Sequence, residues 1–290
     1  MPNDNNRTCR GGNAVQNRRW LVFEALRYIA LSAMMAFSLY GLFFMVMNSF
    51  KTEAQMTINY WLPEWKNLAW ENYEFGWKAV SPYIWNSIYI GLFTVAGTLL
   101  VGVISAYIFA RFRFPGKEML YIGVISLMMI PGILTFIPSF IIVQKLGLLN
   151  SPLALIIPGI AGGQVMAIFL LRAFFEQISK ELLEAARIDG ATEGSILLRI
   201  VLPLAIPMVM TISILTLLGS WNSYIWPLVT ISDQTYWTLP LGIANISSGY
   251  DVKRTQMYAA YTVASLPLMA VFLFTMKYFI EGLSSGSVKG

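Results

Sequence analysis

The sequence predicts an all-α membrane protein with about six transmembrane helices, and three observations support this prediction. Apolar residues make up 57% of the 290 residues and charged residues only 12%, whereas a soluble domain carries about 25% charged residues. The mean hydropathy is +0.61. Several apolar runs reach the length of about 18 residues that a membrane-spanning helix needs. A chain this poor in charge cannot cover a water-facing surface, so most of it must face lipid or other buried helices.

A polar, basic segment precedes the first apolar run. Its pair Arg18-Arg19, followed by apolar residues, resembles a twin-arginine export signal. Glu24 and Arg27 interrupt that apolar stretch, however, and no small-residue cleavage site follows it. We therefore interpret residues 1–27 as a cytoplasmic tail.

Six apolar runs predict the spans, and polar segments separate them. After the first run comes a segment with four tryptophans among Glu and Lys residues (61–77), which is typical of a loop at the membrane surface. Seven prolines lie within the later runs. Each forfeits a backbone hydrogen bond that protein or water must replace, so we expect kinked helices around a cavity. The spans are predicted at about 28–47, 83–110, 119–143, 152–171, 200–231 and 257–280.

The basic residues predict the orientation of these spans. With the amino terminus inside, fourteen of the 20 Lys and Arg residues fall in inner segments and six in outer ones. The positive-inside rule then places both termini in the cytoplasm. Because topology accounts for the net charge of +5, no nucleic-acid partner is expected.

The residue types present also limit the chemistry. Histidine is absent and Cys9 is the single cysteine, which excludes an intramolecular disulfide and a cysteine-cluster metal site and removes the commonest general base. No Asp, Glu, Lys or Arg lies near the middle of a predicted span, so a proton-coupled carrier or a voltage sensor is not favoured. The chain also lacks the phosphate loop Gly-x-x-x-x-Gly-Lys-Ser/Thr. We expect the energy source to lie in another chain.

The polar segment before the fifth span predicts two short helices joined at a glycine. Ser179 is a suitable N-cap for a helix over Lys180–Ile188, Gly190 supplies the left-handed residue that ends it, and Thr192 caps the second helix. The first helix carries a small apolar surface, made of Leu182, Leu183, Ala186 and Ile188. We expect this pair of helices to contact a cytoplasmic partner.

The same segment resembles a known motif. Its residues Glu184-Ala185-Ala186, Gly190, Ile200 and Leu202-Pro203 resemble the EAA loop of binding-protein-dependent ABC importer permeases. Three further stretches resemble the sugar-importing, maltose-type permeases and, among them, the shorter G-type subunit; they are Arg111–Lys117, Trp221–Pro227 and Glu281–Gly290.

This resemblance covers the chain after the basic tail and implies a fold, a location and partners. It implies the type I ABC importer permease fold in the bacterial inner membrane, with a transmembrane domain at 28–280, a coupling-helix loop at 176–199 and a cytoplasmic tail at 281–290. The implied partners are a homologous F-type permease, two ATP-binding cassette subunits that bind ATP and Mg, and an extracytoplasmic solute-binding protein. No cofactor is expected in this chain, which is not expected to be an enzyme.

The resemblance also assigns roles to residues. Those expected to couple to the ATPase are Glu184, Ala185, Ala186, Asp189, Gly190 and Pro203. Those of the tail that reaches the ATPase are Ser285, Gly286 and Lys289. Those of the loop that contacts the binding protein are Asn245, Ser248, Gly249 and Tyr250.

Amide, hydroxyl and aromatic side chains in the spans could line the path of a sugar. The residues of this kind are Asn86, Ser87, Gln164, Trp221 and Asn222, although helix packing would account for each equally well. Maltose-like saccharides, acidic alginate-like ones and glycerol phosphate all stay open as substrates. A membrane-bound transferase, a self-sufficient carrier or channel, and a permease for amino acids or peptides are the alternative functions.

Overall fold

The computed structural model describes the backbone of residues 9–59, 61–249 and 252–285, with side chains for residues 20, 23–59, 61–249 and 252–277. This part of the chain is helical and contains no strand, so the predicted all-α class is confirmed. The chain divides into two compact units, which are Met1–Tyr73 with Lys253–Thr262, and Glu74–Val252 with Val263–Gly290.

Within its described residues, the first unit contains two helices of its own and the beginnings of two more. Helix α1 spans Cys9–Ser49, so it begins inside the predicted tail, and α2 spans Glu53–Ile58. The long helices α3 (Glu71–Arg111) and α13 (Arg254–Ser285) begin in this unit. The start of α3 lies inside the segment predicted as a tryptophan-rich loop, which is therefore partly helical.

Buried polar contacts hold the first unit together. The Asn72 side-chain amide donates to the carbonyls of Ser49 (2.9 Å) and Lys51 (2.8 Å). The Lys51 ammonium donates to Asn48 Oδ1 (3.0 Å) and to the carbonyl of Asn59 (2.8 Å), and its burial lowers its pKa. Because such groups are costly to bury without partners, these bonds fix the turn between α1 and α2.

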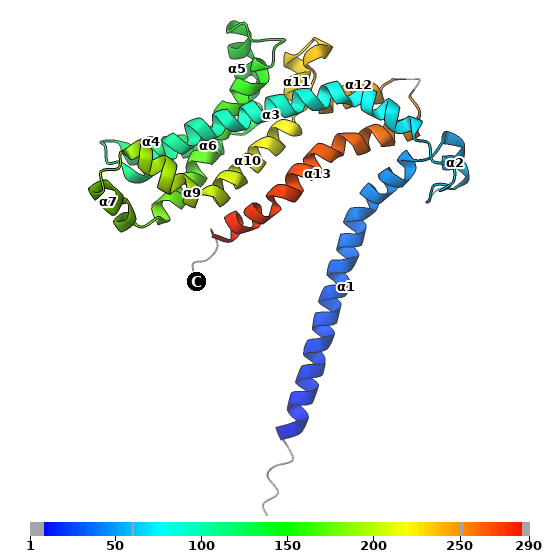
Figure 1. Cartoon of the computed structure of the whole chain (residues 1–290), viewed down its shortest axis with the longest axis horizontal. Coiled ribbons are helices and arrows are strands. Elements are labelled where there is room, and N and C mark those ends of the chain that lie inside the picture. Colours follow the sequence, from blue (N-terminus) through cyan, green and yellow to red (C-terminus); the bar gives the residue numbers. More distant parts are fainter. Residues whose placement is uncertain (1–8, 60, 250–251, 286–290) are drawn as a thin grey trace, which may run out of the picture. The chain divides into compact units, whose positions relative to one another are not determined.

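The second unit contains the other helices of the described residues, and most of them are labelled in Figure 1. They are α4 (Lys117–Ser126), η1 (Leu127–Met129), α5 (Gly132–Lys145), α6 (Leu153–Gln177), α7 (Lys180–Ile188), α8 (Glu193–Ile196), the π-helical turn η2 (Leu197–Val201), α9 (Leu202–Leu204), α10 (Ile206–Trp221), α11 (Ile225–Thr230), η3 (Gln234–Tyr236) and α12 (Leu239–Ser247).

Four helical segments of the described chain are each long and apolar enough to cross a membrane, and the number is up to six if each of two bent pairs of helices is one span. The four are Phe23–Ser49, Glu71–Arg111, Leu153–Gln177 and Arg254–Lys277. The two bent pairs correspond to the third and fifth predicted spans, in which we expected kinks at the prolines.

The bends confirm the expected kinks, and proline explains them. Lys117–Met129 meets Gly132–Lys145 at 102°, and Glu193–Leu204 meets Ile206–Trp221 at 79°. Pro131 stands between the first two segments as the N-cap of α5. Pro203 and Pro207 flank the second break at Ala205. Proline has no N–H to continue the ladder of helical hydrogen bonds, so a helix ends or bends where it occurs.

Small residues bring α3 and α6 together in the core of the second unit. A Cβ atom on Gly159 would lie 2.8 Å from Thr94 Cγ2, and one on Gly163 would lie 2.9 Å from Thr98 Oγ1. Gly159 and Gly163 therefore allow the two helices to pack closely. A buried cluster next to it includes Leu171, Phe175, Leu183 and Ile196, and it joins α6 to the short helices α7 and α8.

Candidate functional site

The segment that the sequence singles out forms two short helices with defined caps. The Ser179 hydroxyl accepts a hydrogen bond from the backbone N–H of Leu182 (3.2 Å), and the Thr192 hydroxyl accepts one from that of Ser195 (3.3 Å). Both predicted N-caps are therefore confirmed. Each satisfies a backbone donor that the first turn of a helix leaves unpaired.

The turn between α7 and α8 depends on Gly190. This residue has φ +82°, a left-handed conformation that glycine adopts without strain. The N–H of Gly190 donates to the carbonyl of Arg187, and that of Ala191 donates to the carbonyl of Ala186, both at 3.0 Å. These two bonds form a Schellman motif, and Asp189, one of the residues expected to couple to the ATPase, is the C-cap of α7.

The apolar residues of α7 do not form one surface, which corrects a prediction from the sequence. Leu183 is 2% exposed and packs with Ala186 into the core cluster. Leu182 is 46% exposed and Ile188 is 86% exposed. One side of α7 therefore fixes it to the second unit, while Leu182, Ile188 and the exposed carboxylate of Glu184 are open to a partner.

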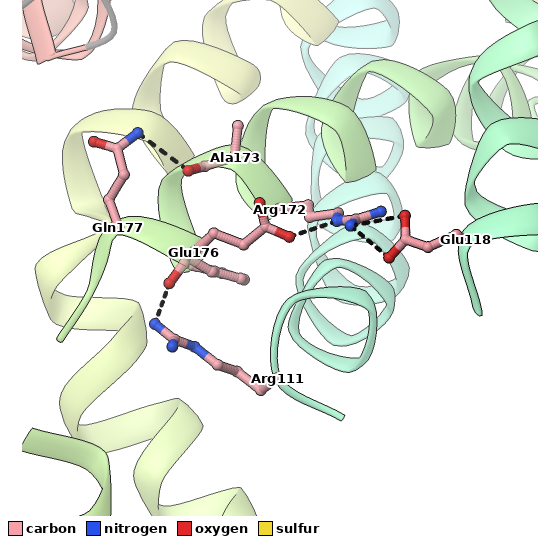
Figure 2. Close-up of polar contacts among 7 residues, drawn as sticks. Arg111, Glu118, Arg172, Ala173, Glu176 and Gln177 are labelled. Atoms are coloured by element: carbon pink, nitrogen blue, oxygen red, sulfur yellow. Dashed lines mark hydrogen bonds and ion pairs between the residues drawn. The ribbon is translucent and has the colours of Figure 1, made fainter. Parts of the chain in front are cut away.

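A polar cluster holds the end of α6 next to this segment. Figure 2 shows the Arg172 guanidinium between two carboxylates. Its Nη2 lies 3.0 Å from Glu118 Oε1, and its Nε lies 2.8 Å from Glu176 Oε1. Its Cζ also lies 3.6 Å from the centre of the Tyr121 ring. Charge-assisted hydrogen bonds and a cation–π contact thus join α4 to α6.

Arg111, the last residue of α3, fixes the last turn of α6. Its guanidinium donates to the carbonyl of Phe175 and to that of Ile178 (2.7 Å). The last carbonyls of a helix have no partner within the helix, and a basic side chain is well suited to bind them. The connection that leads into α7 is therefore attached to α3.

Glu193 joins α8 to both α7 and α3. Its Oε1 accepts from Arg187 Nε at 2.8 Å, and its Oε2 accepts from the Tyr107 hydroxyl at 2.7 Å. The hydrogen bond to Glu193 raises the pKa of Arg187. Sequence analysis missed the contacts of Arg111, Arg172 and Glu193, because all of them except the Arg172–Glu176 pair join different helices or residues far apart in the chain.

The five polar and aromatic residues predicted to line a sugar path make mainly structural contacts. The Asn86 amide donates to the carbonyls of Thr235 (2.8 Å) and Trp237 (2.9 Å), and the Ser87 hydroxyl accepts from the N–H of Leu239 (2.8 Å). The Gln164 amide donates to the carbonyl of Thr98 (3.3 Å). Trp221 is buried, and the Asn222 amide donates to the carbonyl of Leu218.

The remaining predicted residues lie at the ends of helices. Asn245 lies in α12, so the expected loop to the binding protein is partly helical, and Ser248 and Gly249 follow its end. Pro203 is in α9, and Ser285 is the last residue of α13. Tyr250, Gly286 and Lys289 lie outside the described residues. The functional roles assigned to all these residues stay predictions.

A cavity of about 530 Å³ lies between α3, α5, α6, α10 and α11. Its lining includes seven hydroxyl side chains and two aromatic ones, which are Thr94, Thr135, Ser139, Thr216, Ser220, Ser223, Thr238, Phe136 and Trp226. None of the residues predicted for a sugar path lines it. A signal was present in the sequence, because Thr135/Ser139 and Thr216/Ser220 are pairs spaced by four residues, which places each pair on one face of a helix.

The chain is similar to transport proteins of known family. Residues 98–285 match the family described as binding-protein-dependent transport system inner membrane component. The probable ABC transporter permease protein YurM of Bacillus subtilis (strain 168) is 32% identical over 94% of this chain and 91% of that protein. The arabinooligosaccharides transport system permease protein AraQ of the same organism is 34% identical over 78% of this chain and 80% of that protein.

The fold is also found in a solved structure. A crystal structure of a bacterial ABC transporter involved in the import of the acidic polysaccharide alginate superimposes with a TM-score of 0.77 at 23% identity, covering 90% of this chain and 98% of that chain. The permease fold implied by the EAA-like segment is thereby confirmed. The chain belongs to the family of binding-protein-dependent transport system inner membrane components and is a multi-pass, non-catalytic permease subunit of an ABC transporter.

Proposed function

We propose that this chain is the membrane subunit of an ATP-driven importer that moves a saccharide delivered by a solute-binding protein. The observation that carries the proposal is that similar proteins are named for saccharide transport. Besides AraQ, they include the diacetylchitobiose uptake system permease protein NgcG of Streptomyces coelicolor, 28% identical over 92% of this chain. The trehalose transport system permease protein SugB of Mycobacterium tuberculosis is 35% identical over 71% of this chain.

In this proposal α7 is the contact with an ATPase subunit. The exposed Glu184 carboxylate would pair with a basic side chain there, and the neighbouring Ile188 would pack against an apolar one. The capped ends and the buried Leu183 support this role, because a helix that transmits motion between subunits must not unfold or change conformation when the ATPase moves it. Ala185, Ala186, Asp189, Gly190 and Pro203 would serve the same contact as parts of that element.

The mechanism is a switch between two states. When two ATPase subunits bind ATP and Mg and close, α7 would move with the subunit that holds it. Arg111 and Glu193 support transfer of that motion to α3 and α6, because they link α7 and its neighbours to both helices. Those helices, together with a second permease, would then exchange an inward-open path for an outward-open one.

The remaining assignments follow from the same role. Both termini would lie in the cytoplasm, with Ser285, Gly286 and Lys289 reaching toward the ATPase. The segment with Asn245, Ser248, Gly249 and Tyr250 would contact the binding protein on the opposite side of the membrane. The fourteen-to-six distribution of basic residues supports this orientation.

Purification and reconstitution test the proposal. The tagged chain is purified from its own host in mild detergent, and the masses of its companions are measured. We expect a second permease and an ATPase subunit to be recovered with it. Reconstituted with the binding protein in liposomes, the assembly should take up a saccharide only when ATP is supplied. Recovery without an ATPase, or uptake by the chain alone, would refute the proposal.

A further inference from the structure

The 530 Å³ cavity of the second unit has the size and the lining of a site for an uncharged polar ligand. Small-molecule sites usually measure about 300–1,000 Å³ and combine apolar walls with a few polar groups. Among the twenty described residues that line this cavity, none is Asp, Glu, Lys or Arg. Its polar groups are hydroxyls, which both donate and accept hydrogen bonds, as the hydroxyls of a saccharide also do.

Of the seven hydroxyl side chains that line the cavity, those of Thr94 and Thr135 donate to the carbonyls of Ile90 (2.7 Å) and Gly132 (3.0 Å), and the other five make no hydrogen bond within the described residues. In membrane helices Ser and Thr usually bond to the carbonyl four residues earlier. Thr211, Ser213 and Thr230 do so, at 2.9, 2.7 and 2.7 Å. The hydroxyls of four cavity residues make no such bond to any described group; these residues are Ser139, Thr216, Ser220 and Ser223. They are therefore available to a ligand.

Thr238 gives independent evidence. Its side chain is 2% exposed and lines the cavity, and its hydroxyl has no hydrogen-bond partner among the described residues. Thr238 is the N-cap of α12, yet its hydroxyl does not bond to the first turn of that helix. A buried polar group without a partner costs free energy. A ligand hydroxyl in the cavity would remove this cost.

Two aromatic rings complete the lining. Phe136 and Trp226 meet edge to face, with ring centres 5.3 Å apart and an interplanar angle of 88°. The Trp226 indole N–H donates to the carbonyl of Ala154 at 2.9 Å, which fixes the ring while it lines the cavity. A rigid aromatic surface beside hydroxyl groups suits a sugar ring, which has apolar C–H faces and polar edges.

We infer that this cavity contacts the transported molecule and accepts neutral saccharides rather than acidic ones. The inference rests on the proposed function and adds the charge class of the substrate. An anionic sugar would lose its hydration here without a cation to replace it, which is costly. The fold does not decide this point, since the solved transporter of the same fold takes part in the import of an acidic polysaccharide.

The first experiment fills the cavity at a glycine. A Cβ atom on Gly219 meets nothing within 4 Å, although Gly219 lines the cavity. A Cβ atom on Gly162 also meets nothing, and Gly162 does not line the cavity. Gly219→Leu and Gly162→Leu are therefore a matched pair of substitutions. We expect Gly219→Leu to reduce ATP-dependent uptake by the reconstituted assembly about tenfold or more. The added side chain would remove contacts between the ligand and the cavity, and a loss of about 1.4 kcal/mol in binding free energy corresponds to a tenfold change.

The choice of probes separates the possible outcomes. The neutral probes are maltotriose, arabinotriose, trehalose and diacetylchitobiose, and the anionic ones are an alginate trisaccharide and glycerol 3-phosphate. If the wild-type assembly takes up none of the six, the proposed function fails and the inference with it. If it takes up only an anionic probe, the inference fails while the permease role stands. If a neutral probe is taken up equally well by wild type and Gly219→Leu, the cavity is not on its path and the inference fails.

A protection assay tests the cavity directly and independently of transport rate. Cys9 is the single cysteine of the chain, so Cys9→Ser provides a background without cysteines. In this background Ser220→Cys reports on the cavity and Gly162→Cys serves as the control. We expect the transported neutral probe to slow maleimide labelling at position 220 about threefold or more and to leave position 162 unchanged, as expected for a group covered by a ligand. Equal protection by the alginate trisaccharide would overturn the inference, as would no protection at position 220.

Discussion

Gly190 allows a sharp test of the coupling role, because a substitution there changes the backbone conformation without creating a steric clash. Its φ of +82° is unfavourable for residues with a side chain, but a Cβ atom would meet nothing within 4 Å. A substitution therefore introduces strain without a clash, of about 1–2 kcal/mol for most residues, with Asn at the low end and β-branched Val at the high end. If the turn opens instead, two hydrogen bonds of 3.0 Å are lost, each worth about 0.5–1.5 kcal/mol.

Either response moves α7 relative to α8 and costs about 1–3 kcal/mol locally. We therefore expect ATP-dependent uptake and recovery of the ATPase subunit to fall in the order Gly190→Asn, Gly190→Ala, Gly190→Val. Gly190→Asn should stay close to wild type, and Gly190→Val should lose most uptake. Insertion into the membrane should not change, because the turn is outside the apolar segments.

The control for this series is Gly194→Val. Gly194 lies in α8 with no positive φ, and a Cβ atom there also meets nothing within 4 Å. Gly194→Val also replaces a glycine by a valine, four positions further along the chain, but it introduces no strain from a left-handed backbone. Uptake and ATPase recovery are measured in liposomes and by affinity purification. Normal uptake by Gly190→Val, or an equal loss in Gly194→Val, would refute the argument from the turn.

Three further predictions follow from named contacts. Glu184→Lys should abolish ATPase recovery while Glu181→Lys, the same charge change on the same exposed helix, should not; equal losses would indicate a general charge effect. Arg172→Met should lower the free energy of unfolding in detergent by about 1–3 kcal/mol. This is less than the loss of a fully buried ion pair would cost, because the side chains of Glu118 and Glu176 are 63% and 46% exposed and water can hydrate them. A loss below about 0.5 kcal/mol would contradict this prediction. Asn72→Leu should lower the free energy of unfolding by about 2–4 kcal/mol, because two buried carbonyls lose their hydrogen-bond donor. If the variant had the same thermal stability as the wild type, this prediction would be wrong.

Features set by neighbouring residues could be predicted from the sequence. The caps at Ser179 and Thr192 and the left-handed turn at Gly190 involve residues no more than five positions apart, so the pattern of residue types is sufficient. The apolar runs likewise predicted where the spans lie. The prolines predicted kinks in the third and fifth spans, but the residue types do not predict how large the bends at Pro131 and Ala205 are.

The site itself depends on contacts between distant residues, and these could not be predicted. Asn86 was chosen for its amide, but that amide is occupied by carbonyls about 150 positions further along the chain. Arg172 binds Glu118, 54 positions away, although its pairing with Glu176 has a local spacing. The cavity lies between five helices, so its hydroxyls become one lining only after folding. The residue types were informative, but their grouping required tertiary structure.

The break at Pro131 has a consequence for how the protein is made. Helices α4 and α5 contain 10 and 14 residues and are therefore about 15 and 21 Å long, whereas the hydrocarbon layer is about 30 Å thick. Neither can cross it alone, and the unpaired backbone groups at their junction cannot face lipid. We expect this region to leave the insertion machinery only after α6 has been synthesised and can cover it. Ribosome stalling before and after residue 177 would reveal this order.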